Sequence, residues 1–253
     1  MNYHPKQDLL SQRIIMVTGA GDGIGREAAL TYARYGASLL LLGRTEATLA
    51  AVQREIAAEG GATARIYLLD LASASAQDFS RLAGRMATDI PRLDGLLNNA
   101  GQLGEVRPMA QQSADVWRQV MEVNVNGTFL LTQALLPLLL QATHPSLVFT
   151  SSSVGRQGRA HWGAYAVSKF ATEGMMQVLA EEYPVTTLRV NCINPGGTRT
   201  AMRADAFPNE NSHGLKTPAD IMPIYLYLMG DDSCRKTGIS FDAQPDRKAG
   251  PAL

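Results

Sequence analysis

Short apolar runs alternate with longer amphipathic segments along this chain of 253 residues. The short runs predict buried strands at 14–17, 38–42, 64–69, 95–97, 147–150, 188–193 and 239–241. The longer segments predict helices at 24–35, 46–59, 76–90, 114–122, 128–141, 164–182 and 218–229. Strands that are apolar on both faces need helices on both sides of a parallel sheet. We therefore expect one α/β domain over residues 1–253, a doubly wound, Rossmann-like parallel sheet of about seven strands.

Composition and charge argue against several kinds of partner. Lysine plus arginine, 23, equals aspartate plus glutamate, 23, so the net charge is zero with neutral histidine. Such a balance does not suit nucleic acid or a membrane surface, and a small molecule is expected as the partner. The most apolar run, 130–140, is too short to span a bilayer, and residues 1–12 have no signal core. Cys192 and Cys234 form neither a disulfide framework nor a metal-ligand spacing, so we expect a soluble, cytoplasmic protein without a metal site.

A glycine-rich turn lies between the first predicted strand and the first predicted helix. It reads Thr-Gly-Ala-Gly-Asp-Gly-Ile-Gly over residues 18–25. Glycines permit a tight turn close to a pyrophosphate, and the N–H groups and dipole of the following helix favour an anion. A dinucleotide site is predicted at Gly19, Asp22, Gly23, Ile24 and Gly25. The spacing Gly-x-x-x-Gly-x-Gly differs from the commoner Gly-x-Gly-x-x-Gly, and a plain glycine-rich turn is the alternative.

Polar and small residues follow two later strands. Asp70 ends the third strand, where its carboxylate could accept a hydrogen bond from an adenine amino group, and a turn cap is the alternative. Asn98, Ala100 and Gly101 come after the fourth strand, where they would leave room for a ribose, although an Asn/Gly turn explains the same residues. We assign these four residues, with Leu71, to the cofactor site.

Tyr165 and Lys169 lie four positions apart in a predicted helix. Such neighbours lie about 5–6 Å apart at Cβ. A cation near a phenol lowers its pKa from about 10, which makes tyrosine a usable acid and base. Taken alone, the pair is also compatible with a half-buried ring beside a solvated amine.

Together these motifs resemble the short-chain dehydrogenase/reductase family in their order and approximate spacing. The matching segments are 18–25, Asp70, 98–101, 124–127, 151–153, 165–169 and 195–200. The resemblance extends from about residue 14 to residue 242. Segments 151–159 and 194–203 are similar to a bacterial branch of that family that has no assigned substrate.

The resemblance implies an oxidoreductase that interconverts a carbonyl and a secondary alcohol by hydride transfer, with Tyr165 as acid and base. Lys169 would lower the pKa of Tyr165 and hold the nicotinamide ribose. Ser152, thirteen residues before Tyr165, would bind the developing alkoxide, with Ser151 and Ser153 as competing choices. Asn124 would steady a water that relays protons, although a local cap or kink is the alternative.

The turn after the sixth strand completes the implied cofactor site. The residues assigned there are Pro195, Gly196, Thr198 and Thr200. By resemblance, Thr198 fixes the nicotinamide carboxamide together with the backbone of Ile193, and a simple loop turn is the alternative. Residues 201–216 are polar and without clear periodicity, which favours a mobile substrate lid.

The end of the second strand indicates which nicotinamide cofactor fits. A carboxylate there binds the ribose hydroxyls of NAD, whereas an arginine accommodates the extra phosphate of NADP. The position has no acid, and Arg44 offers a planar charged fork suited to a phosphate. Asp22 argues the other way, because some NADP-using relatives carry a base there. We expect NADP(H), with NAD(H) as the alternative.

Substrate, assembly and reaction type are less constrained. Arginines at 156, 159, 199 and 203 would suit an anionic substrate or would be solvated, and Leu103, His161, Trp162, Met202 and Phe207 are candidate pocket residues. Helices 128–141 and 164–182 have wide apolar faces, so at least a homodimer is expected. The tail 242–253 departs from the family's glycine-rich ending, which puts a tetramer in doubt. The rival functions are a lyase or epimerase with a retained nicotinamide, and a nucleotide-binding regulator without turnover.

Overall fold

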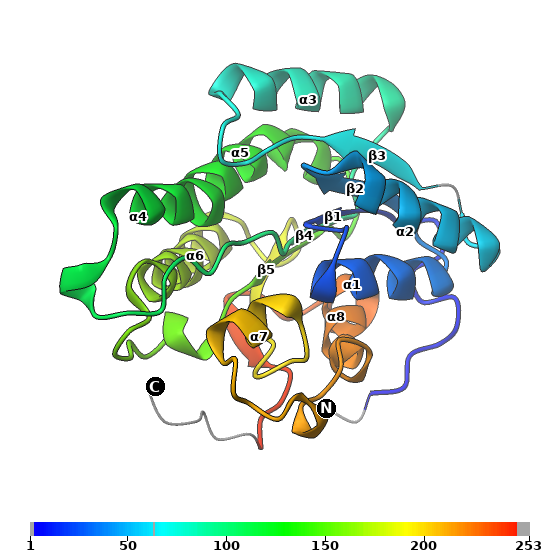
Figure 1. The fold of residues 1–253 in the computed structure, drawn as a ribbon. Helices are drawn as coiled ribbons and strands as arrows, with labels where there is room; N and C mark the ends of the chain where they lie inside the picture. Colours follow the sequence, from blue (N-terminus) through cyan, green and yellow to red (C-terminus); the bar gives the residue numbers. More distant parts are fainter. Residues whose placement is uncertain (1–2, 63, 247–253) are drawn as a thin grey trace.

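All seven strands of the sheet are parallel in the computed structural model, which describes residues 3–62 and 64–246 (Figure 1). Their order is β3-β2-β1-β4-β5-β6-β7, which reverses direction between β1 and β4. The strands are β1 Ile14–Thr18, β2 Ser38–Gly43, β3 Arg65–Leu68, β4 Gly95–Asn98, β5 Ser146–Thr150, β6 Arg189–Asn194 and β7 Ile239–Asp242. The predicted doubly wound fold is confirmed.

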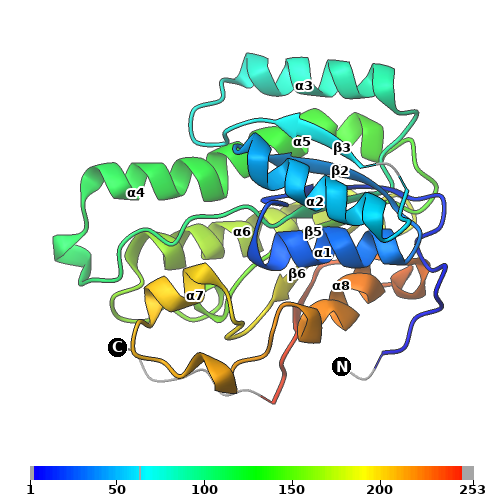
Figure 2. The same ribbon diagram turned by 45° about the vertical axis from the view of Figure 1, so that its right-hand side comes forward.

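Two layers of helices enclose the sheet. The helices are α1 Gly23–Arg34, α2 Glu46–Ala58, α3 Ala76–Asp89, α4 Ala114–Met121, α5 Thr128–Leu139, α6 Gly163–Glu182, α7 Ala201–Ala206 and α8 Met222–Met229. Helices α1, α2 and α8 cover one face, and α3, α5 and α6 cover the other, as Figures 1 and 2 show. Strand β2 explains the continuous apolar runs, because Leu39 and Leu41 enter one core while Leu40 and Leu42 enter the other.

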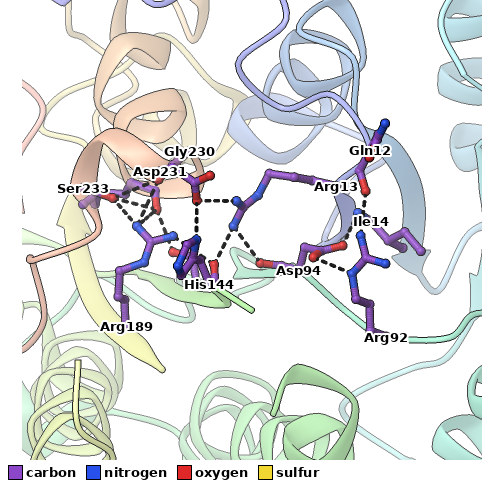
Figure 3. A network of polar contacts seen from close by, with 12 residues as sticks. Gln12, Arg13, Ile14, Arg92, Asp94, His144, Arg189, Gly230, Asp231 and Ser233 are labelled. Atoms are coloured by element: carbon purple, nitrogen blue, oxygen red, sulfur yellow. Dashed lines mark hydrogen bonds and ion pairs between the residues drawn. The ribbon is translucent and has the colours of Figure 1, made fainter. Parts of the chain in front are cut away.

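Buried arginines join the amino ends of the strands (Figure 3). Arg13, just before β1, donates to Asp231 and to the His144 carbonyl, both at 2.7 Å. Arg189, at the start of β6, is 1% exposed and donates to the Gly230 carbonyl at 3.0 Å and to the Ser233 hydroxyl. Burial lowers the pKa of Arg189 to about 10, and the nearby positive charge of Arg13 contributes to the same shift. A buried cation needs such partners, so this network holds the edge of the sheet opposite the cleft described below.

The helical layers differ from the sequence-based expectation in two places. Residues Glu122–Gly127 form a π-helical turn that joins α4 directly to α5, where two separate helices were expected. The segment 201–216 begins with the short helix α7, although no periodicity predicted one. The Thr200 hydroxyl accepts from the Arg203 N–H at 3.2 Å and so caps this helix.

The end of the chain lies only partly within the described residues. Asp242, expected to open the tail, is the last residue of β7, and residues 247–253 lie outside the described part. Among the helices that the structure describes, none combines the length and the apolar character that a membrane crossing requires.

Candidate active site

A cleft opens at the carboxyl ends of β1, β4, β5 and β6, where the strand order reverses. The predicted residues that line it are Gly19, Asp22, Gly23, Ile24, Ala100, Gly101, Ser152, Tyr165, Lys169, Pro195, Gly196, Thr198 and Thr200. Segments far apart in the sequence therefore meet at one site, as the motif spacing predicts.

The glycine turn is shaped for a group that approaches its backbone. Gly19 has a φ of +64°, and a Cβ there would lie 3.0 Å from the Cα of Ala100. A Cβ on Gly25 would lie 2.2 Å from the Gly19 carbonyl oxygen, so a side chain at either position would disrupt the turn. Helix α1 begins at Gly23, and its N-cap Asp22 makes no side-chain capping bond. The N–H groups at this helix start fit the pyrophosphate of a dinucleotide.

Tyr165 and Lys169 lie side by side on α6 at the floor of the cleft. The Nζ atom of Lys169 lies 5.6 Å from the centre of the Tyr165 ring and donates a hydrogen bond to the Thr150 carbonyl at 2.7 Å. Burial lowers the pKa of Lys169 to about 8, and the charges of Cys192 and Glu173 oppose that shift.

The pKa of Tyr165 moves in the direction opposite to the prediction. Burial raises it to about 12, and a hydrogen bond with Ser152 opposes the rise. The predicted lowering by Lys169 is not found, because Lys169 gives its hydrogen bond to a carbonyl rather than to the phenol and because burial dominates. Tyr165 is therefore a protonated phenol at neutral pH in this structure.

The three serines after β5 have different partners. Ser152 lines the cleft, and its hydroxyl is close enough to Tyr165 to oppose the rise in the pKa of that phenol. Ser151 also lines the cleft, but it is fully buried and donates to the carboxylate of Glu173. Ser153 begins a short 3-10 turn and does not line the cleft. This arrangement supports Ser152 over its two neighbours.

Asn124 lies behind the cleft, in the π-helical turn. Its Oδ1 accepts from the Gln102 N–H at 2.7 Å, and its Nδ2 donates to the Gln102 carbonyl and to the Ser168 hydroxyl, both at 2.9 Å. A Cβ on Gly101 would lie 3.3 Å from Oδ1 of Asn124 and 3.7 Å from Nζ of Lys169. Asn124 thus fixes the wall next to Lys169, and it lies in the π-helical turn that joins α4 to α5.

Other predicted cofactor residues lie outside the lining of the cleft. Asn98 turns towards α5 and donates to the Thr132 hydroxyl at 2.9 Å. The carboxylate of Asp70 accepts from the Ala72 N–H at 3.0 Å, which is the turn cap named as its alternative. Leu71 is buried in the core, Gly25 lies beneath the glycine turn, and Arg44 is exposed between β2 and α2. Their contact with a cofactor stays a prediction.

The turn after β6 is stabilised by hydrogen bonds from Gln244, which follows β7. The side-chain amide of Gln244 donates to the carbonyls of Pro195 and Gly197, at 2.9 and 3.1 Å. The Thr198 hydroxyl donates to the Pro195 carbonyl at 3.2 Å. These bonds hold the segment at the same cleft as Tyr165 and Lys169.

A family model described as short chain dehydrogenase matches residues 13–211. The chain belongs to this family. It is 67% identical over 250 residues to the "Uncharacterized oxidoreductase YciK" of Escherichia coli, and the match covers 99% of each chain. This agrees with the bacterial branch that segments 151–159 and 194–203 resemble.

Two solved short-chain dehydrogenases that resemble this chain contain a nucleotide. The one from Shigella flexneri, complexed with NADP, is 66% identical with a TM-score of 0.93, and the match covers 95% of this chain and 100% of that chain. The one from Escherichia coli, complexed with NADPH, is 68% identical with a TM-score of 0.94 and the same coverage. Close relatives of this short-chain dehydrogenase therefore hold a nicotinamide cofactor.

The ring of Trp162 lines the cleft of this family member beside Tyr165, and Phe207 packs against Trp162 outside the lining. Trp162 lies 5.8 Å from the ring of Tyr165 and 5.7 Å from the ring of Phe207, between centroids. The guanidinium of Arg203 lies 3.6 Å from the centre of Phe207 and binds Glu210 through Nε and Nη2, at 2.6 and 2.7 Å. Leu103, Met202 and Ala206 add apolar surface. His161, the neighbouring candidate, does not line the cleft.

Two lining residues were missed in the sequence. Asn99 lines the cleft next to the predicted Asn98, and Thr150 ends β5 directly before Ser151. The Thr150 hydroxyl donates to the side-chain carbonyl of Asn99 at 3.1 Å. The signal available was their position at strand carboxyl ends, where the side chains of a doubly wound sheet meet a ligand.

Proposed function

We propose that this short-chain dehydrogenase is an NADP(H)-dependent oxidoreductase that interconverts a carbonyl and a secondary alcohol. The observation that carries the proposal is the meeting of Ser152, Tyr165 and Lys169 with the glycine turn in one cleft. The nucleotides in the two solved relatives support the cofactor. When bound, the nicotinamide supplies or accepts the hydride.

The side chains at the cleft would each have a separate role in the proposed reaction. Tyr165 holds a proton at neutral pH and gives it to the carbonyl oxygen during reduction, or takes it from the alcohol during oxidation. Ser152 donates a hydrogen bond to the same oxygen, where negative charge develops. Lys169 would hold the ribose of the cofactor, and Asn124 would steady a water that relays protons through Lys169 towards Tyr165.

Arg44 carries the preference for NADP(H) in this proposal. The residue is exposed, lies directly after β2 and makes no ion pair within the described part of the chain. An arginine in this place binds the extra phosphate through two parallel hydrogen bonds. Asp22 remains as an exposed opposing charge at the start of α1.

The substrate side of the cleft suits an uncharged carbonyl compound with an apolar, flat body. The wall beside Tyr165 is aromatic and aliphatic. The neighbouring arginines are already engaged: Arg156 with Asp242, Arg203 with Glu210, and Arg199 with the Ser212 carbonyl. An anionic substrate would have to displace these bonds, so we do not favour it.

Residues 201–216 would act as the substrate lid. The backbone N–H of Arg199, just before this segment, donates to the Lys216 carbonyl at 2.8 Å, which ties the two ends of the segment together. Helix α7 contributes Met202, Arg203 and Ala206 to the cleft. A movement of the segment about its tied base would open and close the wall without disturbing Tyr165.

We further propose a cytoplasmic homodimer. Exposed large apolar side chains lie on α5, at Phe129, and on α6, at Phe170 and Val178. Such residues favour an interface between copies rather than contact with water. Size-exclusion chromatography with light scattering tests this, and a clean monomer at micromolar concentration would reject it.

A screen of carbonyl compounds with NADPH tests the reaction. Oxidation of NADPH, followed at its absorbance band, is expected with apolar ring ketones. Product without a net change in the cofactor would favour a lyase or epimerase, and NADPH binding without conversion of any compound would favour a regulator.

A further inference from the structure

A side chain from beyond the end of β7 reaches the turn that follows β6. Gln244 lies two residues after β7, and its amide Nε2 donates to the carbonyls of Pro195 and Gly197, at 2.9 and 3.1 Å. The same Nε2 lies 3.5 Å from the hydroxyl oxygen of Thr198. One side chain therefore binds the turn 195–198 from a point 46 to 49 residues further along the chain.

The remaining residue of the turn, Gly196, leaves room for this amide. Gly196 has a φ of +70°, and a Cβ there would lie 3.0 Å from Nε2 of Gln244 and 3.3 Å from its Cδ. A side chain at 196 would push against the amide, so the bare backbone of Gly196 and the side chain of Gln244 fit each other. Pro195, Gly196 and Thr198 line the cleft, whereas Gln244 does not. Gln244 thus supports the turn from outside the lining of the cleft.

The position of Gln244 is itself fixed by the sheet. Asn194 of β6 pairs with Asp242 of β7, and the Ala243 N–H donates to the Asn194 carbonyl at 2.9 Å. The side chain of Asn194 donates to the Asp242 carboxylate at 2.7 Å and accepts from the Gly196 N–H at 3.1 Å. A group carried next to a rigid strand positions its partner more accurately than one on a free loop.

The turn needs support from outside because of its own sequence. Gly196 and Gly197 are consecutive glycines, which give an unsupported backbone many conformations. Hydrogen bonds to the carbonyls on either side of Gly196 select one of these conformations before a ligand arrives. Order that exists in the free protein does not have to be formed on binding, so it increases affinity.

We propose that Gln244 is a positioning residue that holds the turn 195–198 in the conformation that receives the nicotinamide end of the cofactor. Its two donated hydrogen bonds carry this role, since they fix the carbonyls of Pro195 and Gly197. The link to hydride transfer rests on the proposed function, whereas the order of the turn does not. The segment 242–253 departs from the family's glycine-rich ending, and a glycine at 244 would have no amide to donate.

The first test compares two ligands by calorimetric titration. NADPH contains the nicotinamide, whereas adenosine 2′,5′-bisphosphate has the adenosine and the extra phosphate without it. Gln244→Met keeps the length and loses both donors, so the affinity for NADPH is expected to fall about 5–30-fold. The affinity for the bisphosphate is expected to stay unchanged, because this ligand does not reach the turn.

Gln53→Met is the matched control. The side-chain amide of Gln53, on α2, donates to the Ala64 carbonyl at 2.6 Å, so this variant loses a hydrogen bond of the same kind away from the cleft. Both affinities are expected to equal those of the wild type.

The second test needs no ligand. Amide hydrogen exchange in the segment 195–200 of the free protein is expected to be faster in Gln244→Met than in the wild type, and unchanged in Gln53→Met. A merely structural role of Gln244 would instead speed exchange throughout the sheet and weaken both ligands alike.

Three results would overturn the proposal. They are an unchanged NADPH affinity in folded Gln244→Met, an equal loss for the two ligands, and unchanged exchange in the turn. If Gln244→Met does not fold, Gln244→Glu keeps the shape, replaces the donating amide by an acceptor and gives the same readouts.

Failure of this proposal differs from failure of the proposed reaction. If the NADPH loss and the faster exchange are found but the wild type reduces no carbonyl compound, the reaction fails and the role of Gln244 stands. If the wild type reduces such compounds while Gln244→Met binds NADPH as tightly as the wild type, the reaction stands and the role of Gln244 fails.

Discussion

The ammonium of Lys169 lies beside the ring of Tyr165, 5.6 Å from its centre, yet gives its hydrogen bond to the Thr150 carbonyl. Burial moves the two pKa values in opposite directions, down to about 8 for Lys169 and up to about 12 for Tyr165. Burial favours the neutral form of both groups, but at pH 7 both still hold their protons. This protonation state suits the proposed reduction, in which Tyr165 would give its proton to the carbonyl oxygen.

Replacing Tyr165 with Phe is expected to lower kcat about 10²–10⁴-fold, since the general acid is lost. NADPH binding, followed by fluorescence, is expected to stay within a small factor of the wild type. Tyr183→Phe, at the end of α6, is the control and should leave kcat unchanged. Full turnover by Tyr165→Phe would exclude the assigned proton transfer.

Arg44→Ala is expected to weaken NADPH about 10–100-fold, because a charged hydrogen bond contributes about 1.5–3 kcal/mol. The affinity for NADH is expected to change little, since NADH lacks the extra phosphate. Arg54→Ala, an exposed arginine on α2, is the matched control. Equal losses of NADPH and NADH affinity, measured by calorimetric titration, would refute the assignment.

The pKa of Lys169 predicts how stability depends on pH. Its value in the folded protein is about 8, below the ordinary 10.5, so between these values the unfolded chain binds more protons than the folded one. Stability attributable to Lys169 therefore rises with pH across this window. From pH 8 to pH 10 the unfolding free energy of the wild type should gain on the order of 2 kcal/mol relative to Lys169→Met. Urea unfolding at both pH values measures this, and parallel changes in the two proteins would contradict it.

Trp162→Ala is expected to raise KM for a flat ring ketone about 5–10-fold, since an aromatic contact contributes about 0.5–1.5 kcal/mol beyond its buried area. A small aliphatic ketone should be affected less, because it has less surface to place against the Trp162 ring. Trp117→Phe on α4, outside the lining of the cleft, is the control. Comparable losses for both ketones would indicate that Trp162 supports Tyr165 rather than the substrate.

The strands and most helices could be predicted because their periodicity reflects burial on both faces of the sheet. Which side chain at the end of a strand faces the cleft could not be predicted. Asn98 and Asn99 differ by one position, and because side chains alternate, one turns to Thr132 and the other to the cleft. No local signal shows which of the two faces the ligand.

Features that depend on distant partners were also beyond the sequence. The direction of the Tyr165 pKa depends on how deeply the assembled fold buries the ring. Helix α7 is too short to show a helical period of apolar residues in the sequence. It is stabilised by the Thr200 cap and by the contact of Arg203 with Phe207. The hydrogen bonds from Ser151 and Ser240 to Glu173 join segments that are far apart in the sequence.

The arginine network around Arg13 and Arg189 has an evolutionary consequence. The network stabilises the sheet at the edge opposite the cleft. The residues around Trp162 and α7 therefore do not have to stabilise the sheet themselves. Descendants of such a chain can exchange those residues and acquire new substrates while the scaffold persists.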